Sequence, residues 1–355
     1  MELLRHPQMF YKNTFTIRPD KSRSLIKLNK LFISSFTVLI CIALQSNTAA
    51  QTNNNTRFLP PIISLLLNEQ CPSVIPTTTI TLNTPLSTQD DLDLLTGVTR
   101  IEGDLIFDTS QTTLDFSPLD SLIEVTGGIT FDNQPLANIQ GFNCLNTVGG
   151  ELVFLDNNAL INIDGFNALT NLDQEIVISN NSVLTNIPGF NSLTNLGGRL
   201  VITANIELAE FSGFDSLTLV GTNININSNS LLTNIPEFNS VTTVGGLINI
   251  NNNNLLSVFS GFNALTNIGA ISITNNSSLL DISAFSSLND VQATLTIAIN
   301  PSLLDISGFN ILESENVIEE IEISRNIALD CIVAEPNFLP TNISFDNAVD
   351  CPTTQ

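Results

Sequence analysis

Apolar and polar residues recur together along most of the chain at a spacing of 24 residues. One column of this repeat is phenylalanine, with a single spacing of 23: Phe142, Phe166, Phe190, Phe214, Phe238, Phe262, Phe285 and Phe309. A second column is asparagine: Asn157, Asn181, Asn205, Asn229, Asn253, Asn276, Asn300 and Asn326. A leucine column runs alongside both, from Leu160 to Leu329. Columns that share one period indicate a tandem repeat protein.

Each repeat is predicted to begin with a short strand. In Leu200-Val201-Ile202 the two strongest apolar positions stand at i and i+2, as on a strand with one face inward. Gly-Gly pairs, at 149–150, 197–198 and 245–246, predict a corner where a positive φ angle costs little. The density of Gly, Asn, Thr and β-branched residues disfavours a helix. Each repeat is therefore predicted to be one coil of an all-β solenoid, with its strand about 4.8 Å from the next.

The asparagine column is interpreted as a structural ladder. An asparagine at a tight turn can satisfy backbone groups of its own coil and of the neighbouring coil. The apolar side chains of a single coil do not offset the entropy of ordering its backbone, so the coils must stack to be stable.

Four segments are predicted along the chain. Residues 1–50 form a leader, because two lysines precede the apolar run 31–44 and small residues follow it, as in a secretory signal peptide; an uncleaved anchor is the alternative. Residues 51–70 are a polar linker with an apolar N-terminal cap. Residues 71–330 are the repeat solenoid, and residues 331–355 are a C-terminal cap.

The ends of the solenoid carry further signals. Residues 79–82 are predicted as a first strand, and residues 88–96 as a short helix with a Thr88–Asp91 capping box and Gly97 as its stop. A last strand is expected at 343–345, flanked by Cys331 and Cys351, which are predicted to form a disulfide. Cys71 could form a disulfide at the N-terminal end of the solenoid, and whether it pairs with Cys144 is left open. Without CxxC spacing or a histidine after residue 50, the cysteines do not fit a metal site.

The run L-L-T-G-V-T-R-I-E-G-D-L-I-F at 94–107 is followed by L-x-x-L-x-x-V-x-G-G turns. These motifs resemble the receptor L domain, the family of ligand-binding domains in the insulin and epidermal growth factor receptors, and the L-domain-like, leucine-rich repeat proteins of fungal walls and bacterial surfaces. The resemblance covers about residues 71–351 and implies a right-handed, single-stranded β-helix in an extracellular protein. The chain lacks the Cys-rich module between paired L domains and has more regular coils, so growth-factor binding is not carried over.

Charge and composition narrow the function. From residue 51 onward the chain has four arginines and 32 acidic residues, a formal net charge of −28, with no His, Lys, Tyr, Trp or Met. Such a chain repels nucleic acids and anionic membranes. It also lacks the usual proton shuttles and nucleophile–base pairs, so no enzyme is predicted. A carboxylate pair such as Asp281 and Asp305 keeps a polysaccharide-acting enzyme as a lesser alternative.

The predicted function is therefore recognition or adhesion, in a secreted or cell-surface protein that binds an extracellular protein or polysaccharide. The predicted binding residues point outward from successive strands: Val201, Thr203, Asn225, Asn227, Asn249, Asn251, Ser272 and Thr274. We call these eight residues the predicted face. No cofactor is required for this function.

Two other polar columns suggest alternatives. A structural or ice-binding solenoid could use the threonine column Thr170, Thr194, Thr218, Thr242 and Thr266. Calcium could bind to an oxygen-rich column that has no recognised calcium-loop spacing: Asn162, Asn186, Glu210, Asn234, Asp281 and Asp305.

Overall fold

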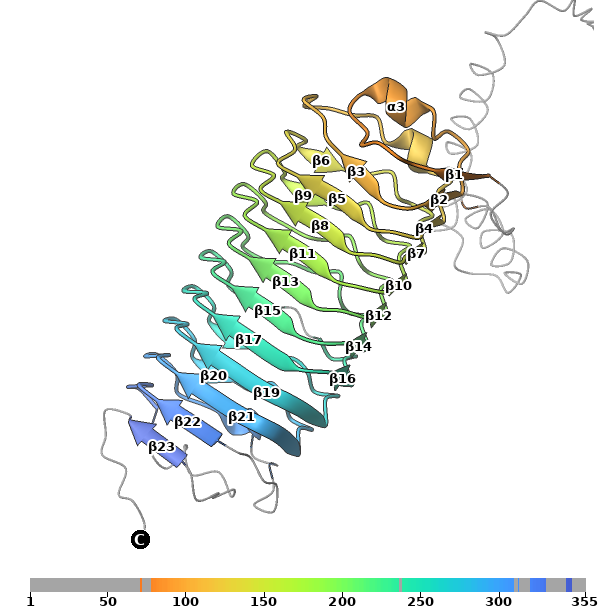
Figure 1. Cartoon of the computed structure of the whole chain (residues 1–355). Coiled ribbons are helices and arrows are strands. Elements are labelled where there is room, and N and C mark those ends of the chain that lie inside the picture. Colours follow the sequence, from red (N-terminus) through yellow and green to blue (C-terminus); the bar gives the residue numbers. More distant parts are fainter. Residues whose placement is uncertain are drawn as a thin grey trace, which may run out of the picture. The chain divides into compact units, whose positions relative to one another are not determined.

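The computed structural model describes residues 71, 78–235, 238–309, 312 and 320–329, and the backbone of 343–346. All of these residues belong to the compact unit Leu67–Gln355; the other unit is Met1–Leu66. The described residues form a stack of coils, a β-solenoid (Figure 1). The predicted leader over 1–50 and the linker and cap over 51–70 lie outside the described residues, as does the segment 331–342.

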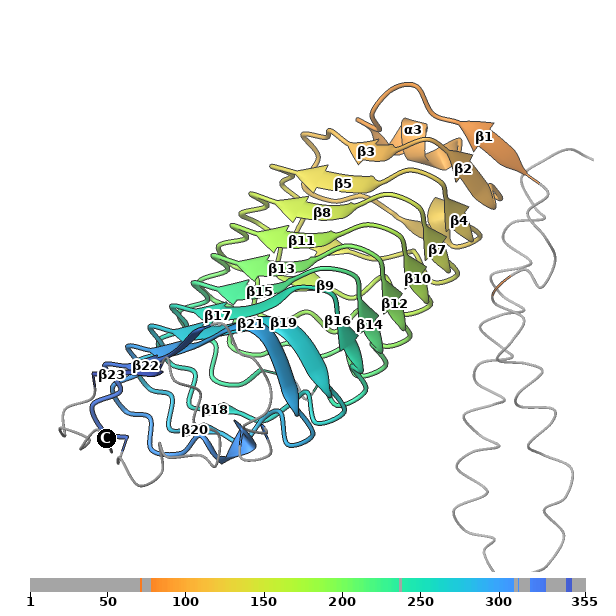
Figure 2. The same cartoon turned by 60° about the horizontal axis from the view of Figure 1, so that its bottom comes forward.

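Two parallel sheets follow the stack, and Figure 2 shows them as two sides of each coil. The first, called the short sheet, joins β1 (Thr79–Thr81), β2 (Arg100–Glu102), β4 (Glu124–Val125), β7 (Thr147–Val148), β10 (Asn171–Leu172), β12 (Asn195–Leu196), β14 (Leu219–Val220) and β16 (Thr243–Val244). The second, called the long sheet, joins β3 (Leu105–Phe107), β5 (Ile129–Asp132), β8 (Leu152–Leu155), β11 (Ile176–Ser179), β13 (Leu200–Thr203), β15 (Ile224–Asn227), β17 (Leu247–Asn251), β19 (Asn267–Thr274), β21 (Asp290–Ala298), β22 (Glu320–Ser324) and β23 (Ile343–Asp346).

The third side of the coils has only short pairings. They are β6 (Asn138–Ile139) with β9 (Asn162–Ile163), and β18 (Val258–Phe259) with β20 (Asp281–Ile282). In the long sheet Ile176 lies opposite Leu200, and Leu200 lies opposite Ile224, so each of these residues pairs with its equivalent 24 positions on. The predicted solenoid of 24-residue coils is thereby confirmed.

Helical structure is confined to short turns at the two ends of the described stack: α3 (Gln89–Asp93), η1 (Ser117–Leu119) and η2 (Ser307–Phe309). The capping box predicted before α3 is present: the Thr88 side chain accepts from the Asp91 amide, and the Asp91 carboxylate accepts from the Thr88 amide. Gly97 follows the helix with a φ of 79°. The strands predicted at 79–82 and 343–345 correspond to β1 and β23.

The core is a continuous apolar column in the middle of the coils. Rings of the phenylalanine column stack from coil to coil, with centroids 4.7 Å apart at Phe142–Phe166 and 5.2 Å apart at Phe190–Phe214. A second stack lies under the first strands of the long sheet, at Phe107, Phe131 and Phe154. These rings are buried, and burial in a shared core explains why one coil needs its neighbours.

The Gly-Gly corners exist for a reason other than the predicted one. None of the glycines at 149–150, 197–198 and 245–246 has a positive φ angle. Instead, the backbones of neighbouring coils nearly touch there: a Cβ atom on Gly197 would lie 2.1 Å from the carbonyl oxygen of Asp173, and one on Gly221 would lie 1.8 Å from that of Gly197. The prediction of a positive-φ corner is wrong, because close packing between coils sets the requirement.

Left-handed backbone occurs at a different corner, one residue before the asparagine ladder. The residues with positive φ there are Asn133, Asp156, Asn180, Ala204, Ser228, Asn252, Asn275, Ile299 and Arg325. Asn and Asp tolerate this conformation better than other non-glycine residues, and Ile299 is β-branched, which makes it the most strained of the set. The ladder residue that follows each of them turns its side chain into the stack.

Candidate functional site

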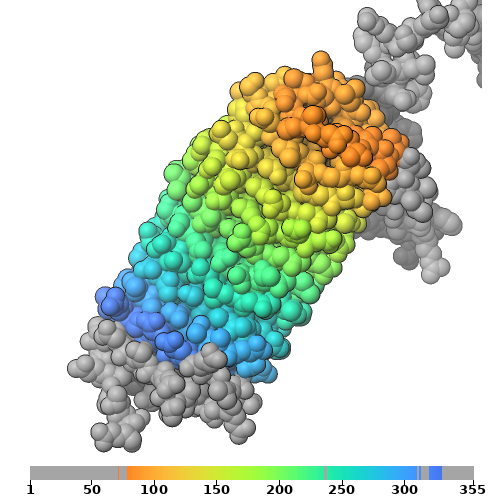
Figure 3. Space-filling model, in the orientation of Figure 1, coloured from red at the N-terminus to blue at the C-terminus, as the bar shows by residue number. Residues whose placement is uncertain are grey.

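The long sheet brings all eight residues of the predicted face together. Parallel register aligns Val201, Asn225, Asn249 and Ser272 in one column across β13, β15, β17 and β19. It aligns Thr203, Asn227, Asn251 and Thr274 in a second column on the same strands. Each of these side chains is partly exposed. In the space-filling view this part of the molecule is a continuous surface of packed side chains (Figure 3).

Both columns continue beyond the predicted face, and they carry no charge between Asp132 and Glu322. The first column runs from Thr130 through valines to Val201. Beyond the predicted face it continues through Thr296 to Glu322. The second runs from Asp132 through Leu155 and Ser179, and later through Ala298 to Ser324. Ser179 and Ala298 are buried, so the second column is less accessible than its outward position predicted.

Charges lie along one edge of this surface. Glu175 and Arg199 form a two-point ion pair, with Nε to Oε2 at 2.6 Å and Nη2 to Oε1 at 3.1 Å. The hydrogen bonds that Arg199 donates to Glu175, and then the charge of Glu175, raise the pKa of Arg199 above its ordinary value. The pair is partly exposed to solvent and contributes little to stability, but it neutralises the edge nearest to Val201.

The asparagine column forms a buried hydrogen-bonded ladder. In Asn229, Oδ1 accepts from the backbone amide of Asn205 at 3.1 Å, and Nδ2 donates to the carbonyl oxygen of Ile202 at 2.9 Å. The backbone amide of Asn229 donates in turn to Oδ1 of Asn253 at 3.0 Å. The same amide-to-Oδ1 bonds run from Asn157 to Asn326, and every ladder side chain is buried. Each asparagine therefore ties its own coil to both neighbours.

Sequence reasoning missed the start of this ladder. Gln134 is buried. Its backbone amide donates to Oδ1 of Asn157 at 2.8 Å, and its side-chain Oε1 accepts from the backbone amide of Thr109 at 2.8 Å. The available signal was an amide side chain 23 residues before Asn157, preceded by Asn133, a residue type that tolerates a positive φ angle.

Four of the five hydroxyls in the threonine column donate to the preceding coil. Oγ1 of Thr194 donates to the carbonyl oxygen of Thr170 at 3.1 Å, and Oγ1 of Thr218 donates to that of Thr194 at 3.0 Å. Thr170 and Thr242 make the equivalent bonds. A threonine hydroxyl that donates its hydrogen to the neighbouring coil cannot donate it to ice or to a ligand. This geometry therefore favours a structural role for the threonine column.

The oxygen-rich column lies on the third side. Asn162 and Asn186 form a bridge, and so do Asp281 and Asp305, whereas Val258 takes the place between Asn234 and Asp281. Across the described part of the chain, no three His, Cys, Asp or Glu side chains are grouped so as to hold a metal ion.

The disulfide left open by the sequence is present. Cys71 and Cys144 are bonded, which joins the N-terminal end of the described chain to the coil that contains Phe142. Cys331 and Cys351 lie outside the described residues, so their pairing stays a prediction.

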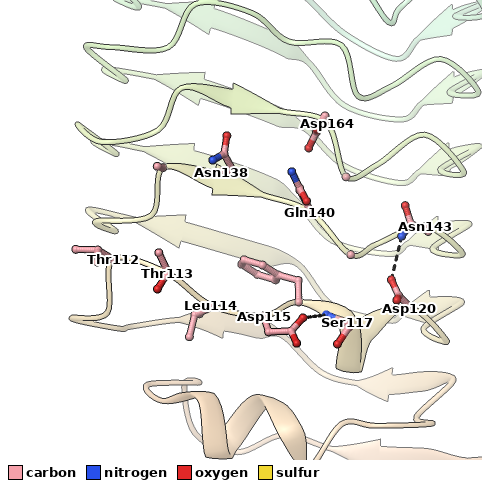
Figure 4. Close-up of a pocket in the computed structure, with 14 residues that line it drawn as sticks. Thr112, Thr113, Leu114, Asp115, Ser117, Asp120, Asn138, Gln140, Asn143 and Asp164 are labelled. Carbon is pink, nitrogen blue, oxygen red and sulfur yellow. Dashed lines mark hydrogen bonds between the residues drawn. The ribbon is translucent and has the colours of Figure 1, made fainter. Parts of the chain in front are cut away.

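A hollow of about 550 Å³ opens on the third side of the first coils and was not predicted (Figure 4). It is bordered by residues of three successive coils: Thr112 to Ser117 with Asp120, then Ala137 to Gly141 with Asn143, and then Asp164 and Gly165. Phe166 comes nine positions after Asn157, Phe142 eight positions after Gln134, and Phe116 seven positions after Thr109. The third side is thus shorter in the first coils, and this shortening was the available signal.

No protein-family model matches the chain, and no curated protein or solved structure matches it significantly. Within the described ranges, every helix is too short or too polar to cross a membrane.

Proposed function

We propose that the protein is a non-catalytic recognition or adhesion protein, secreted or held at the cell surface, that binds an extracellular protein or polysaccharide through the predicted face. The observation that carries this proposal is the register of the long sheet, which sets two side-chain columns in line on β13, β15, β17 and β19. The resemblance to receptor L domains supports an extracellular setting.

Side-chain chemistry supports this choice of surface. The amides of Asn225, Asn249 and Asn251 both donate and accept hydrogen bonds, so they suit hydroxyl groups and peptide groups alike. The columns carry no charge between Asp132 and Glu322, which lowers the cost of removing water from the surface. A ligand that extends along the stack would meet equivalent positions about every 4.8 Å.

The test is binding of the labelled full-length protein to intact cells of its source and to their isolated wall polysaccharide. Saturable binding is expected, and Asn249→Arg should weaken it by roughly ten-fold. Thr243→Arg is the matched control, because it adds the same charge at an exposed position of β16 in the same coil but on the short sheet.

Two results would contradict the proposal. One is an absence of saturable binding to both the cells and the polysaccharide. The other is an equal loss of binding in the Asn249→Arg and Thr243→Arg proteins, since that would show a general effect of charge. Thermal melts of both variants establish that each is folded.

A further inference from the structure

We propose that the hollow on the third side of the first coils binds a neutral saccharide through the hydroxyl groups of the sugar. This site is separate from the predicted face and does not depend on it. Its volume of about 550 Å³ falls in the usual range for small-molecule sites. Figure 4 shows that its polar side chains come from successive coils and border one shared space.

A solvent-shielded acceptor is the first observation that points to a ligand. Oδ1 of Asp164 is buried at the rim of the hollow and has no hydrogen-bond partner in the described protein. A buried acceptor without a partner costs about 1–3 kcal/mol. Asp164 as a whole is partly exposed, so a small rotation of its side chain would bring this oxygen within reach of a ligand hydroxyl, whose hydrogen bond would remove that cost.

The other carboxylates at the hollow are held in place. Oδ1 of Asp115 accepts from the backbone amide of Ser117 at 3.0 Å, and Oδ1 of Asp120 accepts from Nδ2 of Asn143 at 2.9 Å. The loop that carries Asp115 is fixed by Gln89 of α3, whose Oε1 accepts from the Asp115 amide at 2.8 Å and whose Nε2 donates to the Asp115 carbonyl at 3.0 Å. The acceptors are therefore pre-arranged, which lowers the entropy cost of binding.

The lining selects the class of ligand. It contains no Lys, Arg or His, so its carboxylates would repel phosphates, sulfates and acidic sugars. Asn138 and Gln140 add amide groups that donate and accept, and Thr112 and Ser117 add hydroxyls. This combination fits vicinal hydroxyls, which both donate and accept. Phe116 is buried at the hollow and offers no exposed ring for stacking, so we expect millimolar affinity.

The site has room for more than one sugar unit. A second hollow of about 730 Å³ shares residues 112–115 with the first and extends to Gln89 and Gln111. A disaccharide could therefore contact both sides of this loop, and we expect disaccharides to bind more tightly than their monosaccharides.

The experiment is a calorimetric titration of the full-length protein with glucose, galactose, mannose, cellobiose and lactose at millimolar concentrations. At least one sugar should bind saturably. Ala137→Phe should abolish binding by filling the hollow, and Asp164→Asn should weaken it by roughly ten-fold, because the amide removes one carboxylate oxygen. Ala209→Phe is the matched control: Ala137 and Ala209 accept from the next coil through the same backbone column, but Ala209 lies away from the hollow.

Each other outcome overturns the proposal. Binding of none of the sugars would do so, and so would an equal loss in Ala137→Phe and Ala209→Phe. Binding only of calcium chloride or methylammonium chloride in parallel titrations would show a cation site instead. Asn249→Arg should leave sugar binding unchanged, and Ala137→Phe should leave cell binding unchanged, so the two proposals can fail separately.

Discussion

The coils from Asn157 onward and the two coils before them differ in how they close the same turn. In the later coils an asparagine accepts the backbone amide of the preceding coil, and nine residues lead from it to the phenylalanine. In the earlier coils Gln134 and Thr109 occupy this place, and the third side is shorter. Strict repetition yields a flat surface, whereas the broken repeat yields a concave one lined by polar side chains.

The largest expected effect is on the regular ladder. Asn229→Ala leaves the buried backbone amide of Asn205 without its acceptor, and it removes the side-chain hydrogen bond to the carbonyl oxygen of Ile202, which is also paired within the long sheet. At about 1–3 kcal/mol for the unpaired amide and about 0.5–1.5 kcal/mol for the lost hydrogen bond, the variant should lose about 1.5–4.5 kcal/mol of unfolding free energy. Urea unfolding followed by circular dichroism measures this loss.

Gln134→Ala is the matched change in the irregular region. It leaves the Thr109 amide without its acceptor, and we expect a loss of about 1–3 kcal/mol, smaller than that for Asn229→Ala. Equal losses at the two positions would remove the energetic distinction between the regular ladder and its irregular start.

The corner glycines give the next effect. Gly221→Ala places a Cβ atom 1.8 Å from the carbonyl oxygen of Gly197, and the clash is with backbone that cannot rotate away, so we expect a loss of at least about 2 kcal/mol. Gly97→Ala, before the regular coils, meets no atom within 4 Å but has a φ of 79°, and should cost about 1 kcal/mol. If Gly97→Ala were the more harmful change in a urea melt, positive φ rather than close packing would govern these glycines.

The smallest effect is the pH dependence of the helix that precedes the irregular coils. Hydrogen bonds from the Ser87 amide, and then from the Thr88 side chain and amide, lower the pKa of Asp91. A carboxyl group with a lower pKa in the folded state stabilises the fold at neutral pH, and this contribution is lost as the pH falls through the lowered pKa. Asp91→Asn should therefore melt at a slightly lower temperature than the wild type at neutral pH, and the difference should vanish in strong acid. A difference that persists in strong acid would contradict this assignment.

The structural roles of residues that recur in every coil could be predicted from the sequence. The phenylalanine column predicted a stacked core, and the Thr88–Asp91 pair predicted a capping box, because both are short-range or periodic patterns. The outward positions of the predicted face followed from strand alternation. Gln134, by contrast, was missed because it departs from the asparagine that defines its column.

The sequence by itself determined the all-β coil, its 24-residue length and the alternation of inner and outer residues, because these depend on local spacing repeated many times. Only the tertiary structure decided the role of Gly197 and Gly221, the Cys71–Cys144 bond and the hollow beside Asp164. These features arise where segments from different coils meet. The distance between such segments depends on how the coils stack, and no local pattern records it.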